Sequence, residues 1–347
     1  MTDLKTRSRV IDRVRGVAIL LVMLGHTMTG STAQAQGTFA FRVVWSLQMP
    51  LFFLISGYVT RYLNPLPDSA ALLRQLGRRT LQLMLPFTVW TLLVRGLMFG
   101  QTQLLRIWWL THHMDSAYWF LFSLWVISIG YLCAVFLAGK LAPKRRMVGA
   151  AILFCVFLAL LAAVAVWQGS DFLGGKLTMY YAVFYLVGAL FGAASEKLSL
   201  PRRGLYVGTA VCLVVWVVLL LRFDSYAAAD DLPHIALRAL SSLLGCVGVF
   251  GVASVLNRWD SEPLPRRALL WIGRHTLELY LVHYLCLNLI RITPPPACAS
   301  LRGLGLIALN LCLTLALSVL VTVALSQLRI TRMVFYGKLE KKVVAHE

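Results

Sequence analysis

Three residues that can do chemistry are predicted to share one face of the first helix. Asp12, Arg15 and His26 lie within residues 9–30, RVIDRVRGVAILLVMLGHTMTG, whose centre is apolar. Because an α-helix turns about 100° per residue, His26 lies about 20° from Arg15 and about 40° from Asp12 around the helix. A rise of about 1.5 Å per residue places His26 about 16 Å beyond Arg15. The stretch therefore predicts an acid, a guanidinium and an imidazole at different depths of one face.

An ionisable group at the depth of His26 is costly in a membrane unless it faces a polar cavity, so the stretch indicates a functional site. A simpler interpretation makes Asp12 and Arg15 an interfacial ion pair and His26 a packing residue, and the spacing alone leaves both interpretations open.

The composition is typical of a membrane protein. Of the 347 residues, 59% are hydrophobic and 14% are charged, whereas a soluble domain has about 25% charged residues. Apolar runs near 20 residues recur, and a run of that length crosses about 30 Å of hydrocarbon. We therefore predict an all-α integral membrane protein with about ten transmembrane helices. The predicted segments are 14–30, 39–60, 80–100, 118–139, 147–167, 177–194, 204–221, 235–256, 268–290 and 303–328.

The distribution of basic residues predicts the orientation of these segments. The net charge is +19, and most of the 33 Lys and Arg residues fall in alternate loops. Lys and Arg concentrate in the cytoplasmic loops of membrane proteins, so we expect both termini in the cytoplasm. The same rule explains the charge without nucleic acid as a partner.

We predict one domain, 1–347, which ends in a short basic cytoplasmic tail, 329–347, with no appended soluble domain. The apolar start of the chain is also compatible with a signal peptide. A cleaved segment, however, has no reason to hold an Asp, an Arg and a His in register, so we expect a retained first helix.

Neither the cysteines nor the histidines predict a metal site. Six of the seven cysteines lie in apolar segments and no CxxC pair occurs, so neither a zinc site nor a disulfide framework is indicated. In THHMD, residues 111–115, the side chains of His112, His113 and Asp115 do not share one helical face. We interpret this stretch as a solvated outer loop.

Five motifs occur in an order that points to a known family. DRVRG, with ten residues between Arg15 and His26, is followed by MPLFFLISGYV (49–59), GRRTLQLMLP (77–86), YWFLFSLW (118–125) and LELYLVH (277–283). Together they resemble the acyltransferase 3 family of membrane O-acyltransferases over essentially the whole chain. The short members that resemble fucose and exopolysaccharide O-acetylases look most similar.

The resemblance implies a reaction and a location. It implies transfer of an acetyl or other acyl group from cytoplasmic acetyl-CoA to a hydroxyl of a cell-surface or lipid-linked carbohydrate. Acetyl-CoA is then a co-substrate, and no tightly bound cofactor is expected. The expected partners are acyl-CoA, a carbohydrate or glycolipid acceptor and membrane lipid, and the expected location is the bacterial inner membrane. The acyl group, the acceptor and the oligomeric state are left open by the sequence.

The resemblance also implies roles for the charged residues. His26 is expected to act as general base or as a transient acyl carrier. Arg15, Arg78 and Arg79 are expected to bind the phosphates of the donor, although Arg78 and Arg79 are also ordinary basic residues of a cytoplasmic loop. Asp12 is expected to orient Arg15, three residues away, or else to be an exposed cap.

Six further residues are predicted to line the substrate pocket: Ser56, Tyr58, Trp119, Glu278, Tyr280 and His283. Packing or pocket lining fits Ser56 better than covalent catalysis, which needs an adjacent base. Glu278 is costly to bury alone, and its neighbours Arg274 and His275, four and three residues earlier, are its expected partners.

The chain departs from the family pattern at two places. Related sequences often carry His where this chain has Gln48, and many carry Arg where it has Leu83. A second catalytic histidine is therefore not available at position 48, and the donor must be held partly by other residues.

A rival function is a transporter or flippase of a small solute or lipid-linked sugar. Transporters tend to show inverted repeats and paired broken helices, and we find neither clearly.

Overall fold

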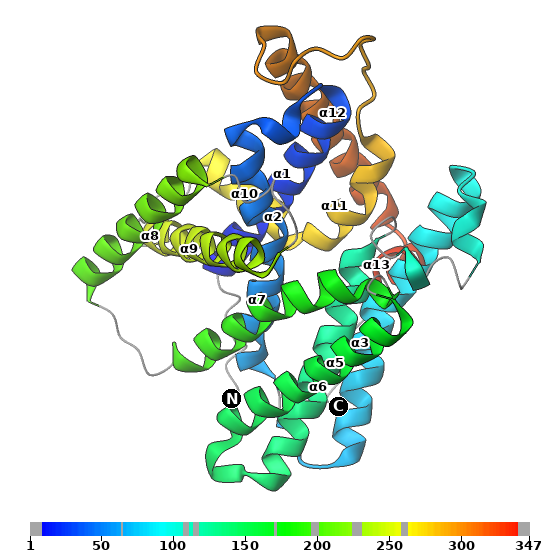
Figure 1. The fold of residues 1–347 in the computed structure, drawn as a ribbon. Coiled ribbons are helices and arrows are strands. Elements are labelled where there is room, and N and C mark those ends of the chain that lie inside the picture. Colours follow the sequence, from blue (N-terminus) through cyan, green and yellow to red (C-terminus); the bar gives the residue numbers. More distant parts are fainter. Residues whose placement is uncertain are drawn as a thin grey trace. The chain divides into compact units, whose positions relative to one another are not determined.

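The computed structural model describes residues 9–63, 65–106, 111–113, 118–169, 172–195, 201–223, 231–257 and 263–338. Within these ranges every regular element is a helix (Figure 1), which confirms the all-α prediction. The extended backbone is limited to one isolated parallel bridge between Ala33 and Ala297.

Eight helical stretches in the described part of the chain are long and apolar enough to cross a membrane. They are α2 (Phe39–Tyr58), α3 (Ser69–Thr88) with its π-helical continuation η3 (Val89–Met98), α5 (Trp119–Leu141), α6 (Arg146–Gln168), α7 (Gly175–Ala194), α8 (Arg202–Arg222), α9 (Leu232–Leu256) and α12 (Leu301–Leu325). Each overlaps one of the ten predicted segments, although the helix that contains most of the predicted segment 80–100 already begins at Ser69. The chain is therefore a helical integral membrane protein.

The other two predicted segments have different structures. Residues 14–30 lie in α1 (Arg9–Ser31), one helix of 23 residues, which is about 34 Å long at 1.5 Å per residue. Residues 268–290 do not form one helix. They divide into α10 (Leu264–Arg274), α11 (Thr276–Val282) and a 3-10 turn, η8 (His283–Cys286), with a non-helical backbone at His275. The count of ten spans and the cytoplasmic termini stay predictions.

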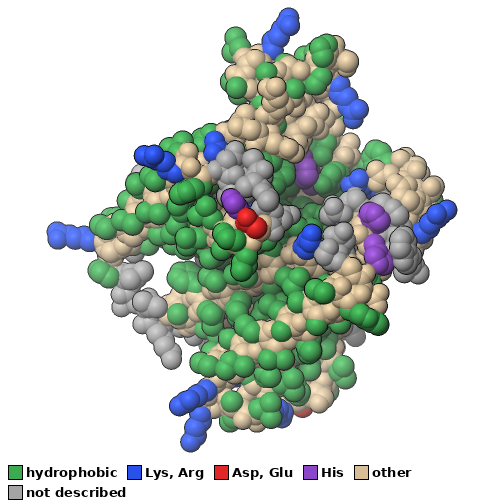
Figure 2. Space-filling model, viewed as in Figure 1, with side chains coloured by type: hydrophobic (Ala, Val, Ile, Leu, Met, Phe, Trp, Pro, Cys, Tyr) green, Lys and Arg blue, Asp and Glu red, His purple; other side chains and the backbone are tan. Residues whose placement is uncertain are grey.

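The membrane helices expose apolar side chains that a soluble protein would bury. On α8, Val207, Val214 and Leu221 are each about 60% exposed, and Leu160 on α6 is similarly exposed. Figure 2 shows hydrophobic side chains over much of the visible surface, with Lys and Arg side chains in small, separate groups. This surface suits contact with lipid tails, in which apolar side chains need no burial.

The chain divides into two compact units, which we describe separately. The first unit comprises residues 1–61 and 187–322, and α1 packs there against α2 and α10. Glycines set the spacing of α1 and α10. A Cβ at position 273 would come within 1.7 Å of the carbonyl oxygen of Asp12, and one at position 16 within 2.6 Å of that of Leu269. The two backbones therefore touch.

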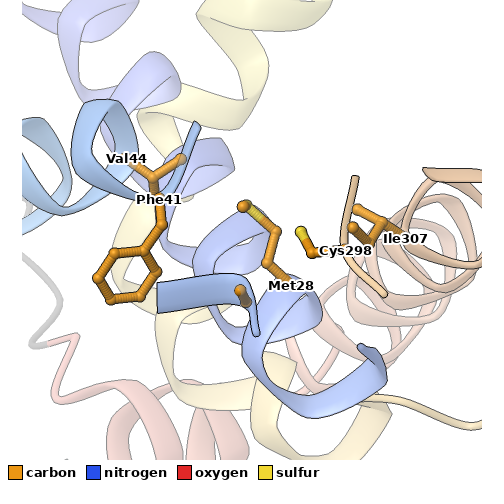
Figure 3. Packing of buried hydrophobic residues seen from close by; sticks show 6 residues of the cluster. Met28, Phe41, Val44, Cys298 and Ile307 are labelled. Atoms are coloured by element: carbon orange, nitrogen blue, oxygen red, sulfur yellow. The ribbon is translucent and has the colours of Figure 1, made fainter. Parts of the chain in front are cut away.

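An apolar cluster fixes the end of α1 that follows His26. Figure 3 shows Met28 of α1 and Cys298 between Phe41 and Val44 of α2 and Ile307 of α12. All five side chains are buried. Residues 291–300, predicted to be non-helical because of their prolines, are non-helical. The cluster and the Ala33–Ala297 bridge attach this segment to α1.

The second unit comprises residues 62–186 and 323–347 and contains α3, η3, α5, α6 and a short helix, α13 (Arg329–Tyr336). The predicted basic tail therefore begins with a helix, and residues 339–347 lie outside the described part. The indole of Trp90 donates a hydrogen bond of 2.8 Å to the carbonyl oxygen of Phe335. Tyr336 is buried, and Gly337 lies against Gln82 of α3. These contacts attach α13 to α3 and η3.

Candidate functional site

The helix α1 carries the three residues that the sequence singled out. Because α1 is one helix from residue 9 to residue 31, Asp12, Arg15 and His26 keep the register calculated for an ideal helix. Arg15 and His26 are half-buried, whereas Asp12 is only 1% exposed. The alternative of Asp12 as an exposed cap is therefore wrong.

Asp12 has an ionic partner on another helix. The Nε of Arg274, the last residue of α10, donates to Asp12 Oδ2 at 3.3 Å, and the Arg274 side chain is 51% exposed. A buried carboxylate needs such a partner. Sequence reasoning assigned Arg274 to Glu278, because that pairing lies within one turn of helix. The structure joins Arg274 to a residue 262 positions away.

The predicted residues of α11 and η8 are buried. Glu278 and Tyr280 of α11 and His283 of η8 are exposed by 4% or less. His275, the other expected partner of Glu278, stacks on Trp271 with ring centroids 4.2 Å apart. Because α11 is short and follows a break in the chain, its burial depends on contacts with α1 rather than on helix propensity.

His26 lies in a cluster of polar rings. Its ring centroid is 5.4 Å from that of His283 and 5.0 Å from that of Tyr284. The hydroxyl of Tyr284 is 3.2 Å from His26 Nε2. The structure thus brings two predicted site residues together and adds Tyr284, which sequence reasoning missed. The signal available for Tyr284 was its position next to His283 in LVHY.

A polar network holds the segment after η8 against α1. Ser31 donates to Asn288 Oδ1 at 2.7 Å, and Asn310 of α12 donates to Ser31 Oγ at 3.0 Å. Asn310 also bonds the backbone N–H and carbonyl of Ile290, at 3.0 and 2.8 Å. Asn288 donates to the carbonyl oxygen of His26 at 3.4 Å. This network keeps residues 283–290 beside the histidine and was not predicted, although Asn310 interrupts an apolar run.

The helix α2 approaches the site through Gln48 rather than through Ser56 and Tyr58. The side chain of Gln48 is buried, with 7% exposed. Its Oε1 lies close to Gly25, the residue before His26, because a Cβ added to that glycine would be 2.9 Å from Oε1. Tyr58 lies ten residues, about 15 Å of helix, further along. There its ring packs against Phe191 and Phe250. Ser56 is half-buried at the same end of α2.

Three predicted residues belong to the second unit. Arg79 of α3 donates to Ser128 Oγ of α5 from Nε and Nη2, at 3.3 and 3.4 Å, while Arg78 is exposed. Trp119 begins α5 and packs its ring on Tyr181 at 5.2 Å. Within this unit Arg79 therefore helps join α3 to α5.

The predicted loop 111–115 is described only in part. The ring of His112 packs on that of Phe172. Asp115 lies outside the described residues.

The amino-acid sequence matches one protein family and is similar to two nodulation proteins. Residues 9–327 match a family model described as "Acyltransferase domain". The chain is 26% identical over 305 residues to "Nodulation protein NolL" of Sinorhizobium fredii (strain NBRC 101917 / NGR234), covering 80% of this chain and 77% of the relative. It is 32% identical over 97 residues to "Nodulation protein NolL" of Mesorhizobium japonicum (strain LMG 29417 / CECT 9101 / MAFF 303099), covering 25% of this chain and 24% of the relative. No solved structure matches.

Proposed function

The chain belongs to the acyltransferase 3 family and is a membrane O-acyltransferase, and from this premise we propose that it transfers an acetyl group from acetyl-CoA to a hydroxyl of a carbohydrate. The acceptor is lipid-linked or destined for the cell surface. The alternative of a transporter or flippase is set aside, because the family identifies an acyltransferase.

The observation that carries the proposal is the polar environment of His26 within an apolar helix. A hydroxyl is a poor nucleophile at neutral pH and reacts when a base takes its proton. In the proposed step His26 accepts that proton while the hydroxyl oxygen bonds to the acyl carbon. The bond between that carbon and sulfur breaks, and the proton passes to the sulfur of the released CoA. His26 as a transient acyl carrier is the second route, and in both routes His26 is essential.

The donor side of the proposal rests on arginines. Arg15 lies on the same face of α1 as His26, about 16 Å nearer the N-terminus. Its guanidinium suits the phosphates of CoA. Asp12 orients Arg274, and we propose that this ion pair fixes the end of α1 at which Arg15 lies. Arg78 and Arg79 stay proposed donor contacts on the strength of the family resemblance alone.

Location and topology complete the proposal. We place the protein in a bacterial inner membrane, since both matched relatives are bacterial proteins. Ten spans with both termini in the cytoplasm follow from the distribution of Lys and Arg. This orientation puts Arg15 on the side where acetyl-CoA is available.

The test measures acetyl transfer in membranes. Membranes with the wild-type chain, His26→Ala or Arg15→Ala receive radiolabelled acetyl-CoA, and glycolipids and glycans of the native host are then extracted. We expect label in a sugar fraction with the wild type only. His234→Ala is the matched control, because His234 lies on α9 with a 41% exposed side chain and contacts Asp231. Full transfer by His26→Ala would refute the catalytic role of His26. No transfer by a well-expressed wild type would refute acetyl-CoA as the donor or a carbohydrate as the acceptor.

A further inference from the structure

The orientation of His283 fixes where its proton lies. The ring is fully buried, and its Nδ1 is hydrogen-bonded to the carbonyl oxygen of Tyr280, three residues earlier. A carbonyl oxygen only accepts hydrogen bonds, so Nδ1 must be the donor. In the neutral imidazole the other nitrogen, Nε2, then carries a lone pair. His283 is therefore held as an acceptor at Nε2.

This acceptor lacks a donor. Among the residues that the structure describes, no hydrogen-bond partner lies within reach of His283 Nε2, although the atom is buried. Buried polar atoms are nearly always paired, and an exception calls for an explanation. A donor that moves within reach of this atom during the reaction would supply one. The ring of His26, whose centroid lies 5.4 Å away, can carry such a donor.

Protonation makes His26 a charged and therefore stronger hydrogen-bond donor toward His283. In the neutral state one nitrogen of His26 is an N–H, and after it takes a hydroxyl proton both are. Its Nε2 already lies beside Tyr284. At the observed ring separation and an interplanar angle of 37°, small rotations can bring a nitrogen of each ring within hydrogen-bond distance.

We propose that His283 is a positioning residue whose Nε2 accepts a hydrogen bond from protonated His26. The bond stabilises the positive charge that forms on His26 as the acceptor hydroxyl loses its proton, and it orients the ring. This inference rests on the proposed role of His26 as the base. His283 acts through His26 rather than on the substrate, because its own ring is fully buried whereas that of His26 is half-buried.

Two substitutions separate this role from packing. His283→Asn keeps an amide N–H near the position of Nδ1, facing Tyr280, and removes Nε2. His283→Gln can place an amide oxygen near the position of Nε2. We expect His283→Asn to lower the rate at saturating acetyl-CoA by about 10- to 100-fold, by analogy with the hydrogen-bond partners that orient metal-binding histidines. The acetyl-CoA concentration that gives half the rate stays unchanged, and His283→Gln recovers part of the rate. His234→Asn is the control.

A spectroscopic measurement tests the same inference without enzyme activity. The chain has seven histidines, so ¹⁵N-histidine NMR spectra of the full chain in detergent micelles can be assigned by substitution. We expect His283 to be protonated at Nδ1 and bare at Nε2. When His26 is protonated, its ¹⁵N resonances should differ between the wild type and His283→Asn.

The outcomes are distinguishable. Wild-type rates in His283→Asn would overturn the inference, as would equal losses in both variants with unchanged His26 resonances. If the wild type transfers no acetyl group, the proposed function fails, and the NMR spectra alone decide on His283. A proton at Nε2 of His283 would then overturn the positioning role of His283. Identical His26 resonances in the wild type and His283→Asn would also overturn it.

Discussion

Replacing Gly273 by Ala should disable the enzyme through the contact between α1 and α10. The new Cβ would lie 1.7 Å from the carbonyl oxygen of Asp12, whereas real Cβ contacts stay beyond 3.0 Å. The obstacle is backbone, so the helices must separate by more than about 1 Å. Overpacking of this kind costs about 1–3 kcal/mol, and a rigid backbone contact belongs at the upper end. A misplacement of about 1 Å near a catalytic group can also lower the rate by about 100-fold.

The assay combines stability and rate. The temperature of half-unfolding in detergent should fall, and acetyl transfer at saturating acetyl-CoA should fall by about 100-fold. Gly208→Ala on α8 is the matched control, because a Cβ there meets no atom within 4 Å. Replacing glycine by alanine in the middle of a helix should by itself stabilise the chain by about 0.5–1 kcal/mol. If the two variants behave alike, the close contact of α1 and α10 does not position the site.

Three further predictions follow from single contacts. Tyr284→Phe removes the hydroxyl beside His26 Nε2, a hydrogen bond worth about 1 kcal/mol, and should slow acetyl transfer by about 5- to 10-fold in the membrane assay. Asn310→Leu leaves buried polar partners unsatisfied and should lower stability by about 2–3 kcal/mol, measured as a lower unfolding temperature with loss of transfer. Trp90→Phe removes the hydrogen bond to α13 and should make that helix more sensitive to limited proteolysis while α1 stays protected.

Local geometry explains why part of the site was predictable. The register of Asp12, Arg15 and His26 depends only on an unbroken helix, and α1 is unbroken. Hydrophobic run lengths likewise located every one of the eight helices long enough to cross a membrane. The ion pair between Asp12 and Arg274 was not predictable, because helical spacing offers only neighbours three or four residues away and Arg274 belongs to another helix.

The break at His275 was missed for a related reason. A long apolar run predicts one continuous helix, and no residue in 268–290 by itself indicates that the helix is interrupted. The need for one comes from α1. Gly273 must lie close against that helix, and the last residue of α10 must reach Asp12. These are contacts between segments some 260 residues apart, which a single sequence does not reveal.

The same break explains how one face of α1 meets two distant residues of the later segment. On a continuous helix, Arg274 and His283 would lie nine residues apart, about 180° around and about 14 Å along the axis. Their partners Asp12 and His26 lie about 40° around and about 21 Å along α1. A straight helix would therefore turn His283 away from His26 whenever Arg274 faced Asp12. The kink at His275 and the 3-10 turn from His283 onward reconcile the two contacts, so the interruption is a requirement for pairing the two histidines.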